Sequence, residues 1–463
     1  MTLQRRQFLR MAAASTILGA TTAGVPLNFT AHAADTSGYK ALVCIFLFGG
    51  MDGHDWLIPY DAESYGSYQG IRQSLLNRYS DGARSRENLL PLSPDNAADF
   101  GSRQFALPPE MPETKRLFDS GRAAFVANVG PLLEPVTADG FASGSARVPS
   151  RLFSHNDQQS TWQSSAPEGA QLGWGGLFGD AAIAAGANSG GTEFTTLSMA
   201  GVGPFLTGNV VSPYQVSLSG SAGLNVLASD QPGLSAFLQR AEDRFRADGF
   251  DERNLLARDI AAKFGDAIDT NRVFDAARGN AVALATAFPD GGLGAQLAAV
   301  AETISIRSAL SASRQIFFVG IGGFDTHSNQ ANDLPGLLSQ IDASLAAFDA
   351  AMVELGVGDS VTTFTASDFG RTLAVNGDGT DHGWGNHQIV MGGAVKGRQI
   401  LGDLPEARFG HGLDGGGGRL IPGLSVEQFA EPLGRWWGLN DAEVAASLPG
   451  LRNFDPAGLS LFA

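Results

Sequence analysis

The chain has 463 residues and a formal net charge of −16. An acidic protein is repelled by a phosphate backbone, so non-specific nucleic-acid binding is excluded as its function. The composition, with 60 glycines and only 17% charged residues, indicates many tight turns and long connections. The single cysteine, Cys44, cannot form an internal disulfide, and we expect a buried thiol because it lies in an apolar run.

The first 33 residues have the pattern of a twin-arginine export signal. Arg5 and Arg6 open the string RRQFLRMAAAS, and residues 11–31 are uncharged and mostly small or moderately apolar. The stretch ends in AHA at 31–33, the small-x-small pattern that signal peptidase accepts. A membrane anchor is the alternative interpretation, but it requires about 20 strongly apolar residues. Serines, threonines and a proline interrupt this stretch.

Export has three consequences for the mature protein. We expect it to begin near Ala34, to meet the twin-arginine translocase during export, and to be periplasmic or secreted. That route carries folded proteins, often with a metal or cofactor already bound, so the signal also suggests one. No later segment is apolar and long enough to span a bilayer, so we expect no transmembrane segment in the mature form.

Five apolar runs predict buried strands. Continuously apolar runs are typical of parallel strands that are covered on both faces. The runs are residues 40–48, 122–129, 315–321, 361–366 and 388–391. Several of these runs end at glycines and acidic residues, and Asp52, Asp325 and Asp368 follow three of them.

Helical patterns lie between the later runs, at 235–264, 276–309 and 334–355, where apolar residues recur every three to four positions. Strands that alternate with helices predict an α/β fold with a doubly wound, mostly parallel sheet. Residues 34–463 are expected to form one domain, because no clean linker interrupts them. Residues of about 189–310 are expected to be an insertion or a helical cap on that domain.

The histidines mark the expected chemistry. Six histidines follow the signal: His54, His155, His327, His382 and His387 lie in strings with acidic residues, and His411 lies in a glycine-rich loop. Ligands of an open parallel sheet gather beyond the carboxyl ends of its strands, where Asp52, Asp325, His327 and Asp368 fall. Carboxylate and imidazole together suit zinc, manganese or iron. Each residue alone also has a structural interpretation, as a turn residue or a helix cap.

These strings together resemble the domain of unknown function 1501 family, over a stretch from about residue 40 to near Trp436. The matching strings are FLFGGMDGHDWLIPYD, RLFSHNDQQSTW, GFDTHSNQ, TASDFGRTLAVNGDGTDHG and VMGGAVKGRQILGDLP. That family is placed in the alkaline-phosphatase-like superfamily, which includes phosphatases and sulfatases. The resemblance therefore implies an alkaline-phosphatase-like α/β fold, although the family's own reaction is not established.

The resemblance also implies roles for individual residues. The superfamily's metal-binding positions look like Asp52, Asp325, His327, Asp368, His382 and His387. The nucleophile position looks like Ser154. One departure matters: where the superfamily has Asp-His, this chain has Asp368-Phe369. A second metal site is therefore expected to be absent, or to be rebuilt with Asp381 or His155.

These residues predict a hydrolase of phosphate or related esters, with one or two divalent ions, zinc or manganese, and a small-molecule or polymer ester as substrate. Arg371 is expected to contact the oxyanion or, alternatively, to orient Asp368. Trp162, Trp174 and Trp384 are expected either to line the pocket or to lie in the core. Neither the formylglycine string C/S-x-P-x-R nor G-x-S-x-G occurs.

Two alternatives of other classes stay open. The first is a non-catalytic, metal-stabilised binding or cell-envelope protein, which Phe369 and the unsettled nucleophile favour. The second is an enzyme of another transfer class, because a fold does not fix a reaction. In the hydrolase interpretation, we expect His327 and His382 to approach each other and Asp325, with Asp52 and Asp368 on the other side. His411 is expected to lie outside the site.

Overall fold

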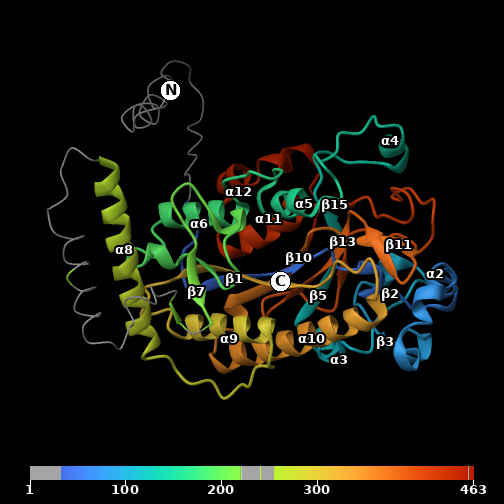
Figure 1. Ribbon diagram of the computed structural model, residues 1–463, viewed down its shortest axis with the longest axis horizontal. Coiled ribbons are helices and arrows are strands. Elements are labelled where there is room, and N and C mark those ends of the chain that lie inside the picture. Colours follow the sequence, from blue (N-terminus) through green and yellow to red (C-terminus); the bar gives the residue numbers. More distant parts are fainter. Residues whose placement is uncertain (1–32, 219, 222–239, 241–254, 457, 463) are drawn as a thin grey trace, which may run out of the picture. The chain divides into compact units, whose positions relative to one another are not determined.

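A computed structural model describes residues 33–462 of the protein, apart from 219, 222–239, 241–254 and 457 (Figure 1). The predicted signal at 1–33 thus lies outside the described residues, except for Ala33. Within the described residues the main sheet has ten strands: nine in the order β14-β5-β13-β10-β1-β9-β6-β7-β8, and β15, which pairs with β5. In the part of the chain that the structure describes, no helix has the length and hydropathy to cross a membrane.

The centre of the sheet is parallel. The strand β1 (Lys40–Phe48) lies between β9 (Arg314–Gly322) and β10 (Val361–Ser367) and runs parallel to both. In register, Leu47 lies opposite Ser367, and Phe48 lies opposite Gly322. The three strands therefore end at the same edge. The mostly parallel sheet expected from the apolar runs is confirmed.

The strand expected at 388–391 has the opposite direction. This strand, β13 (Asn386–Met391), is antiparallel to both of its neighbours, β10 and β5 (Ala123–Gly130). An apolar run shows that a strand is buried but not which way it points. As a result, the first residues of β13 lie at the edge where β1, β9 and β10 end.

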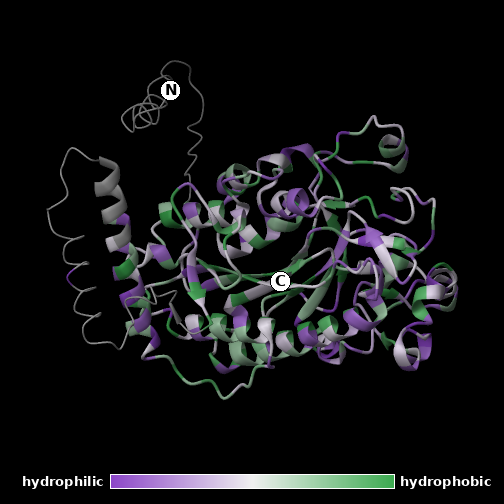
Figure 2. Ribbon diagram, viewed as in Figure 1, coloured by the Kyte–Doolittle hydropathy of each residue, from purple (hydrophilic) through white to green (hydrophobic). Residues whose placement is uncertain are grey.

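Helices cover both faces of the sheet (Figure 1). The side chains of β1 alternate between two cores: Val43 and Ile45 belong to one, Cys44 and Phe46 to the other. Figure 2 shows the central strands coloured mostly as hydrophobic. One face is covered by α3 (Pro112–Asp119), α9 (Gly292–Ser305) and α10 (Gln330–Glu354); the other is covered by α5 (His155–Ser164), α6 (Trp174–Ala184), α11 (Val426–Trp437) and α12 (Asp441–Ser447). The doubly wound arrangement is thereby established.

The segment 189–310 contributes to the main layers. Its strand β6 (Thr196–Ser198) pairs with β9, and β7 (Tyr214–Ser217) pairs with β6. Its helix α9 packs against α10, and α8 (Leu255–Arg278) precedes it in the chain. Most of the helix expected at 235–264 lies outside the described residues.

The remaining elements are the 15-residue helix α2 and several short strands and helices. They are β2 (Ile58–Pro59), α2 (Ala62–Leu76), β3 (Leu90–Pro91), β4 (Phe105–Leu107), α4 (Ala138–Ala142), β8 (Gly220–Ser221), β11 (Arg371–Asn376), β12 (Gly379–His382), β14 (Ile400–Leu401) and β15 (Leu424–Ser425). Of these, β11 and β12 form a separate two-stranded sheet. This hairpin follows β10 directly, so it belongs to the edge where the central strands end.

Candidate metal centre

Four segments bring polar side chains together at this edge of the sheet. Asp325 and His327 follow β9, and Asp368 follows β10. His382 is the last residue of β12, and His155 is the first residue of α5. Segments that are far apart in the sequence thus supply one cluster, as expected for the carboxyl edge of a parallel sheet.

Close backbone approach places the hairpin against the loop after β9. Arg371 lies opposite His382 in the hairpin, so both side chains are fixed by the same pairing. A Cβ on Gly379 would lie 2.2 Å from the carbonyl oxygen of Thr326 and 2.4 Å from the carbonyl carbon of His327. Only glycine permits this approach, which brings β12 beside His327.

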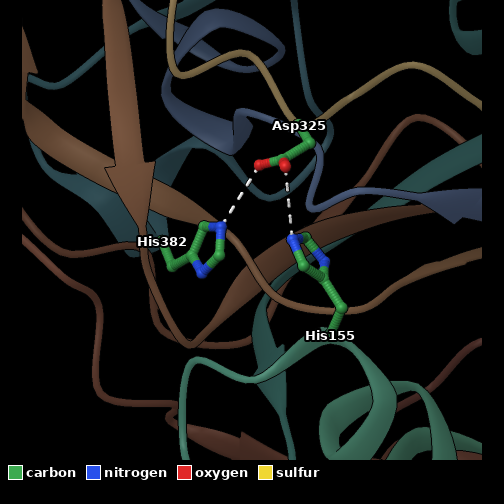
Figure 3. A group of neighbouring side chains, drawn as sticks. All are labelled: His155, Asp325 and His382. Atoms are coloured by element: carbon green, nitrogen blue, oxygen red, sulfur yellow. Dashed lines mark hydrogen bonds and ion pairs between the residues drawn. The ribbon is translucent and has the colours of Figure 1, made fainter.

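Three imidazoles converge on the carboxylate of Asp325. His382 Nε2 lies 3.2 Å and His327 Nε2 lies 3.3 Å from Asp325 Oδ1. His155 Nε2 lies 3.5 Å from Asp325 Oδ2. Figure 3 shows the rings of His155 and His382 approaching different oxygens of Asp325. The same two nitrogens, Nε2 of His327 and Nε2 of His382, are 2.8 Å apart. The expected approach of these histidines to each other and to Asp325 is therefore observed.

The opposite nitrogen of each ring faces an acceptor. Nδ1 of His155 lies 2.7 Å from Asp368 Oδ2, and Nδ1 of His382 lies 2.8 Å from the carbonyl oxygen of Phe153. Nδ1 of His327 lies 3.4 Å from Asp381 Oδ1. An acceptor at Nδ1 favours the proton there, which frees Nε2 of that ring for a metal. Without a metal, one of the two Nε2 atoms of His327 and His382 must carry a proton, because these two atoms are hydrogen-bonded to each other. Metal-binding histidines are commonly held by such an outer acceptor.

The charges around the cluster keep the carboxylate ionised. Burial opposes ionisation of Asp325, but the His382 hydrogen bond and the Arg371 charge outweigh it and lower the pKa of Asp325. Burial lowers the pKa of His382, which favours its neutral form. The hydrogen bond to Asp368 raises the pKa of His155. A bound cation would have to displace a proton from His155.

Three of these side chains, those of His155, Asp325 and His382, fit a divalent ion. Ligands held at about 2.0–2.1 Å in a tetrahedron lie about 3.3 Å from one another, and the three contacts to Asp325 are 3.2–3.5 Å long. Ligand atoms of His155, Asp325 and His382 all lie within 4.8 Å of one another. Nε2 of His155 is buried and has no hydrogen-bond partner among the described residues. This donor set matches the preferences of zinc or manganese.

Phe369 occupies the place where the superfamily resemblance leads one to expect a histidine. Its side chain is fully buried. Its ring centroid lies 4.9 Å from that of His155 and 4.5 Å from that of His382. A Cβ on Gly50 would lie 2.4 Å from the Phe369 ring, and φ at Gly50 is +84°, so glycine is required beside it. Phe369 therefore packs two of the imidazoles in place.

Arg371 pairs with Asp325 rather than Asp368. Its Nη1 and Nη2 donate to Asp325 Oδ1 at 3.1 and 3.2 Å. The Arg371 side chain is completely buried, whereas that of Asp325 is 48% exposed. Arg371 thus orients the exposed carboxylate from behind. The expectation that it orients Asp368 is wrong, because Asp368 instead accepts from His155, Gln159 and the Gly49 N–H.

Asp52 is held by a different cation. Its two oxygens accept from Nη1 and Nη2 of Arg72 at 2.7 and 3.0 Å, and both side chains are completely buried. The side chain of Gln330 and the backbone N–H of His54 donate to it as well. Burial opposes ionisation, but the Arg72 charge outweighs it and lowers the pKa of Asp52. The guanidinium of Arg72 takes the place next to Asp52 that a second metal would need.

The other residues singled out in the sequence make no contact with Asp325 among the interactions of the described residues. His387 is buried, and its Nδ1 accepts from the Asn128 N–H at 3.0 Å. Ser154 Oγ donates to Asp157 Oδ2 at 2.9 Å. His411 belongs to the loop around Asp414, where its Nδ1 accepts from the Leu413 N–H. The indole rings of Trp162, Trp174 and Trp384 are buried in the hydrophobic cores and do not line the cluster.

The roles of two residues, His155 and Arg72, do not follow from the sequence. His155 was named only as a possible replacement ligand, although its string Ser154-His155-Asn156-Asp157 has the pattern of a helix start. Arg72 has no local signal at all, because it lies in the middle of α2. Its partner follows β1 and is found only once the chain is folded.

Comparison with known families identifies the chain. The family described as "Protein of unknown function (DUF1501)" matches residues 39–415. The chain belongs to the DUF1501 family. The search of curated proteins gave no match for this DUF1501 protein.

Solved structures similar to this DUF1501 protein were also found. "Crystal structure of Ps i-CgsB" is 11% identical, with a TM-score of 0.34, over 90% of this chain and 77% of that one. A "PsFucS1 sulfatase from Pseudoalteromonas sp." is 11% identical, with a TM-score of 0.34, over 88% of this chain and 68% of that one. Similarities at this level are too low to transfer an activity.

Proposed function

We propose that the protein is a metal-dependent hydrolase of phosphate or sulfate esters. One observation supports this most strongly: three imidazoles direct Nε2 toward the exposed carboxylate of Asp325. Two of them, His155 and His382, are hydrogen-bonded at Nδ1 to an acceptor. In the proposal His155, His327, His382 and Asp325 hold one divalent ion. Asp52 and Asp368 support the fold and the His155 ring, respectively, and His387 lies outside the ligand set.

A divalent ion held by these residues would act as a Lewis acid, polarising an ester oxygen and stabilising the charge that develops on it. The protein's own residues set the charge and orientation of the ligand side chains. Arg371 keeps Asp325 ionised and fixed, and Asp368 holds the proton of His155 on Nδ1. The start of α5 favours a negatively charged group, because the side chain of Ser154 makes no capping bond to the first N–H groups of the helix.

Ser154 is the proposed nucleophile. It directly precedes His155, and its hydroxyl donates to Asp157 Oδ2. That carboxylate would take the hydroxyl proton as the oxygen bonds to the phosphorus or sulfur. The bond to the ester oxygen breaks in the same step, and the leaving alcohol takes up a proton from water. Water then releases the phosphate or sulfate from the serine.

Metal content and turnover measured together test the proposal. Mature protein exported from its native host should copurify with about one equivalent of zinc or manganese and hydrolyse 4-nitrophenyl phosphate or 4-nitrophenyl sulfate. His327→Ala and His382→Ala should lose both properties, and the melting temperature should fall because a metal held only by the folded state stabilises it. His411→Ala is the matched control and should change neither. Full metal content in both ligand variants would disprove the site.

Ser154→Ala separates the nucleophile from the metal. Metal content should stay the same, and turnover should fall by about a thousandfold or more, because loss of a nucleophile removes the chemical step. If the variant keeps its turnover, water attacks the ester directly and Ser154 is only part of the turn before α5. The protein would then still be an ester hydrolase, but without a serine nucleophile.

A non-catalytic role is the second candidate, and Arg72 is the observation that favours it. Its guanidinium forms an ion pair with Asp52, so that carboxylate is not available to a metal. The described residues therefore offer a place for one metal rather than two. A protein that binds one equivalent of metal, is stabilised by it and turns over neither nitrophenyl ester nor sugar esters would belong to this class.

We also propose export by the twin-arginine route to the periplasm or the outside of the cell. The described chain supports a mature protein that begins near Ala34. The Ala34 N–H donates to Glu443, and the Asp35 N–H donates to the Gly438 carbonyl, so the fold already includes these residues. Lysines in place of Arg5 and Arg6 should retain the protein in the cytoplasm; normal export of that variant would contradict the route.

A further inference from the structure

A hollow of about 290 Å³ lies along α5, the helix whose first residue is His155 of the candidate metal centre. We call it the α5 pocket; its lining includes Phe48, Asn156, Gln159, Gln163, Glu168 and Phe318. Asn156 directly follows His155, and Gln159 donates to the Asp368 carboxylate that holds His155. The pocket and the centre thus share the first turns of α5, and Gln159 contacts the same carboxylate as His155. Its volume is near the lower end of the range for small-molecule sites.

The pocket is lined by amide groups whose hydrogen-bonding capacity is largely open. Among the described residues, the Asn156 side chain makes no hydrogen bond, and Gln159 uses only its Nε2, toward Asp368. Gln163 uses only its Oε1, which accepts from the Phe205 N–H at 3.4 Å. Amide oxygens and nitrogens both accept and donate, as hydroxyl groups do. The open groups therefore suit a ligand with several hydroxyls.

The rest of the lining restricts the ligand further. Phe48 and Phe318 provide aromatic surface, and their ring centroids are 6.3 Å apart. The lining contains one acid, Glu168, and none of its described residues is lysine, arginine or histidine. A second anionic group would find no cation here and would be repelled by Glu168. A purely apolar chain would leave the amides without partners.

We propose that the α5 pocket binds a neutral, hydroxyl-rich ring, a carbohydrate, as the alcohol part of the ester whose charged group lies at the metal centre. This inference rests on the proposed function for its orientation, because the ester group must reach the metal-binding side chains. The amides bind hydroxyls at the rim of the ring, and the aromatic surface packs against its apolar face.

Sugar esters compared with nitrophenyl esters test the assignment in the metal-loaded protein. Hexose sulfates and hexose phosphates should be hydrolysed with higher kcat/KM than 4-nitrophenyl sulfate or phosphate. Asn156→Ala removes an exposed, unbonded amide, and Ala200→Trp fills the pocket from the segment after β6. Both should lower kcat/KM for hexose esters by about tenfold, the effect of one or two lost hydrogen bonds, and leave the nitrophenyl esters within about twofold.

The matched control is Asn209→Ala, an exposed asparagine that does not line the pocket. It should change neither kind of substrate, and metal content should be the same in all three variants. Equal losses on hexose and nitrophenyl esters, or no preference for hexose esters in the unaltered protein, would overturn the assignment.

A binding experiment keeps the two proposals apart. If no ester is hydrolysed, the proposed reaction fails, but neutral hexose disaccharides should still bind, as measured by saturation-transfer NMR on the full chain. Ala200→Trp should abolish that signal, and His327→Ala should preserve it. Absence of the signal, or stronger signals from a nucleoside, a fatty acid or a dipeptide in the same assay, would rule out the carbohydrate assignment.

Discussion

Asp52 and Asp325 follow neighbouring parallel strands and end in different surroundings. Asp52 is completely buried, and the guanidinium of Arg72 balances its charge inside the protein. Asp325 is half exposed, with one guanidinium behind it and three imidazoles in front. The first arrangement satisfies a carboxylate without a ligand, and the second leaves lone pairs for a cation. Neighbours, and not the strand-end position, therefore decide what each carboxylate does.

Asp325→Asn should have the largest effect on metal binding, because it disrupts the half-exposed cluster of three imidazoles around Asp325. An amide removes the charge on which the imidazoles converge, so metal content should fall to a small fraction and ester turnover by more than about a hundredfold. This limit follows because losing even an outer partner of a ligand costs about 10–100-fold. Metal analysis and turnover on the same sample measure it. A variant that keeps its metal would show that the histidines bind it without Asp325, or that the metal binds elsewhere in the protein.

Asp52→Asn should instead affect folding. The change leaves the Arg72 guanidinium buried without its charged partner, which costs about 3–5 kcal/mol of unfolding free energy. Chemical denaturation measures this loss. Any protein that remains folded should bind metal normally. The double variant Asp52→Asn, Arg72→Met should cost less than the single change, because it removes both charges together. Loss of metal in folded Asp52→Asn would make Asp52 part of the metal site.

Asp368→Asn should have a smaller effect on metal binding by the cluster around Asp325. Asp368 accepts from Nδ1 of His155, and an amide there no longer fixes the proton on that nitrogen. Metal affinity should fall by about 10–100-fold, as for other outer partners of ligand histidines. Calorimetric titration of metal-free protein with zinc measures the change. A complete loss of binding would indicate that Asp368 itself is a ligand.

The pH dependence of stability should distinguish the buried histidines from the cluster. Burial lowers the pKa of His54 to about 4 and that of His387 to about 3. Their contribution is complete above the unfolded pKa of about 6.5 and is lost as the pH falls, because the unfolded chain then binds protons that the folded chain does not. Each should lower unfolding free energy by about 1.4 kcal/mol per pH unit below 6.5.

Comparison with His387→Gln isolates this contribution. Unfolding free energies of metal-free protein from pH 7 to pH 5 should fall less steeply in the variant, by the slope of one histidine. Taking the difference between the two proteins cancels the titration of the cluster. Identical slopes would mean that His387 is protonated in the folded protein.

Much of this architecture follows from the sequence. Continuous apolar runs predicted the buried parallel strands, because side chains on both faces of such a strand need apolar cover. Parallel strands end at one edge, so Asp325, His327 and Asp368 were correctly expected to gather there. The glycines around His382 indicated that the hairpin approaches closely, as Gly379 does. These features depend on local pattern and on rules that hold for any open α/β sheet.

The tertiary structure alone decided which partners these side chains have. The direction of β13, the pairing of Asp52 with Arg72 and the choice of Asp325 by Arg371 involve residues that are 20 to 46 positions apart or lie in different elements. His155 joins the cluster from α5, 170 positions before Asp325. The energy of a buried charge depends on the groups a few ångströms away, and those groups are set by packing. The sequence therefore determined that these residues lie at one edge of the sheet. Packing determined which of their carboxylates keeps oxygens available for a ligand.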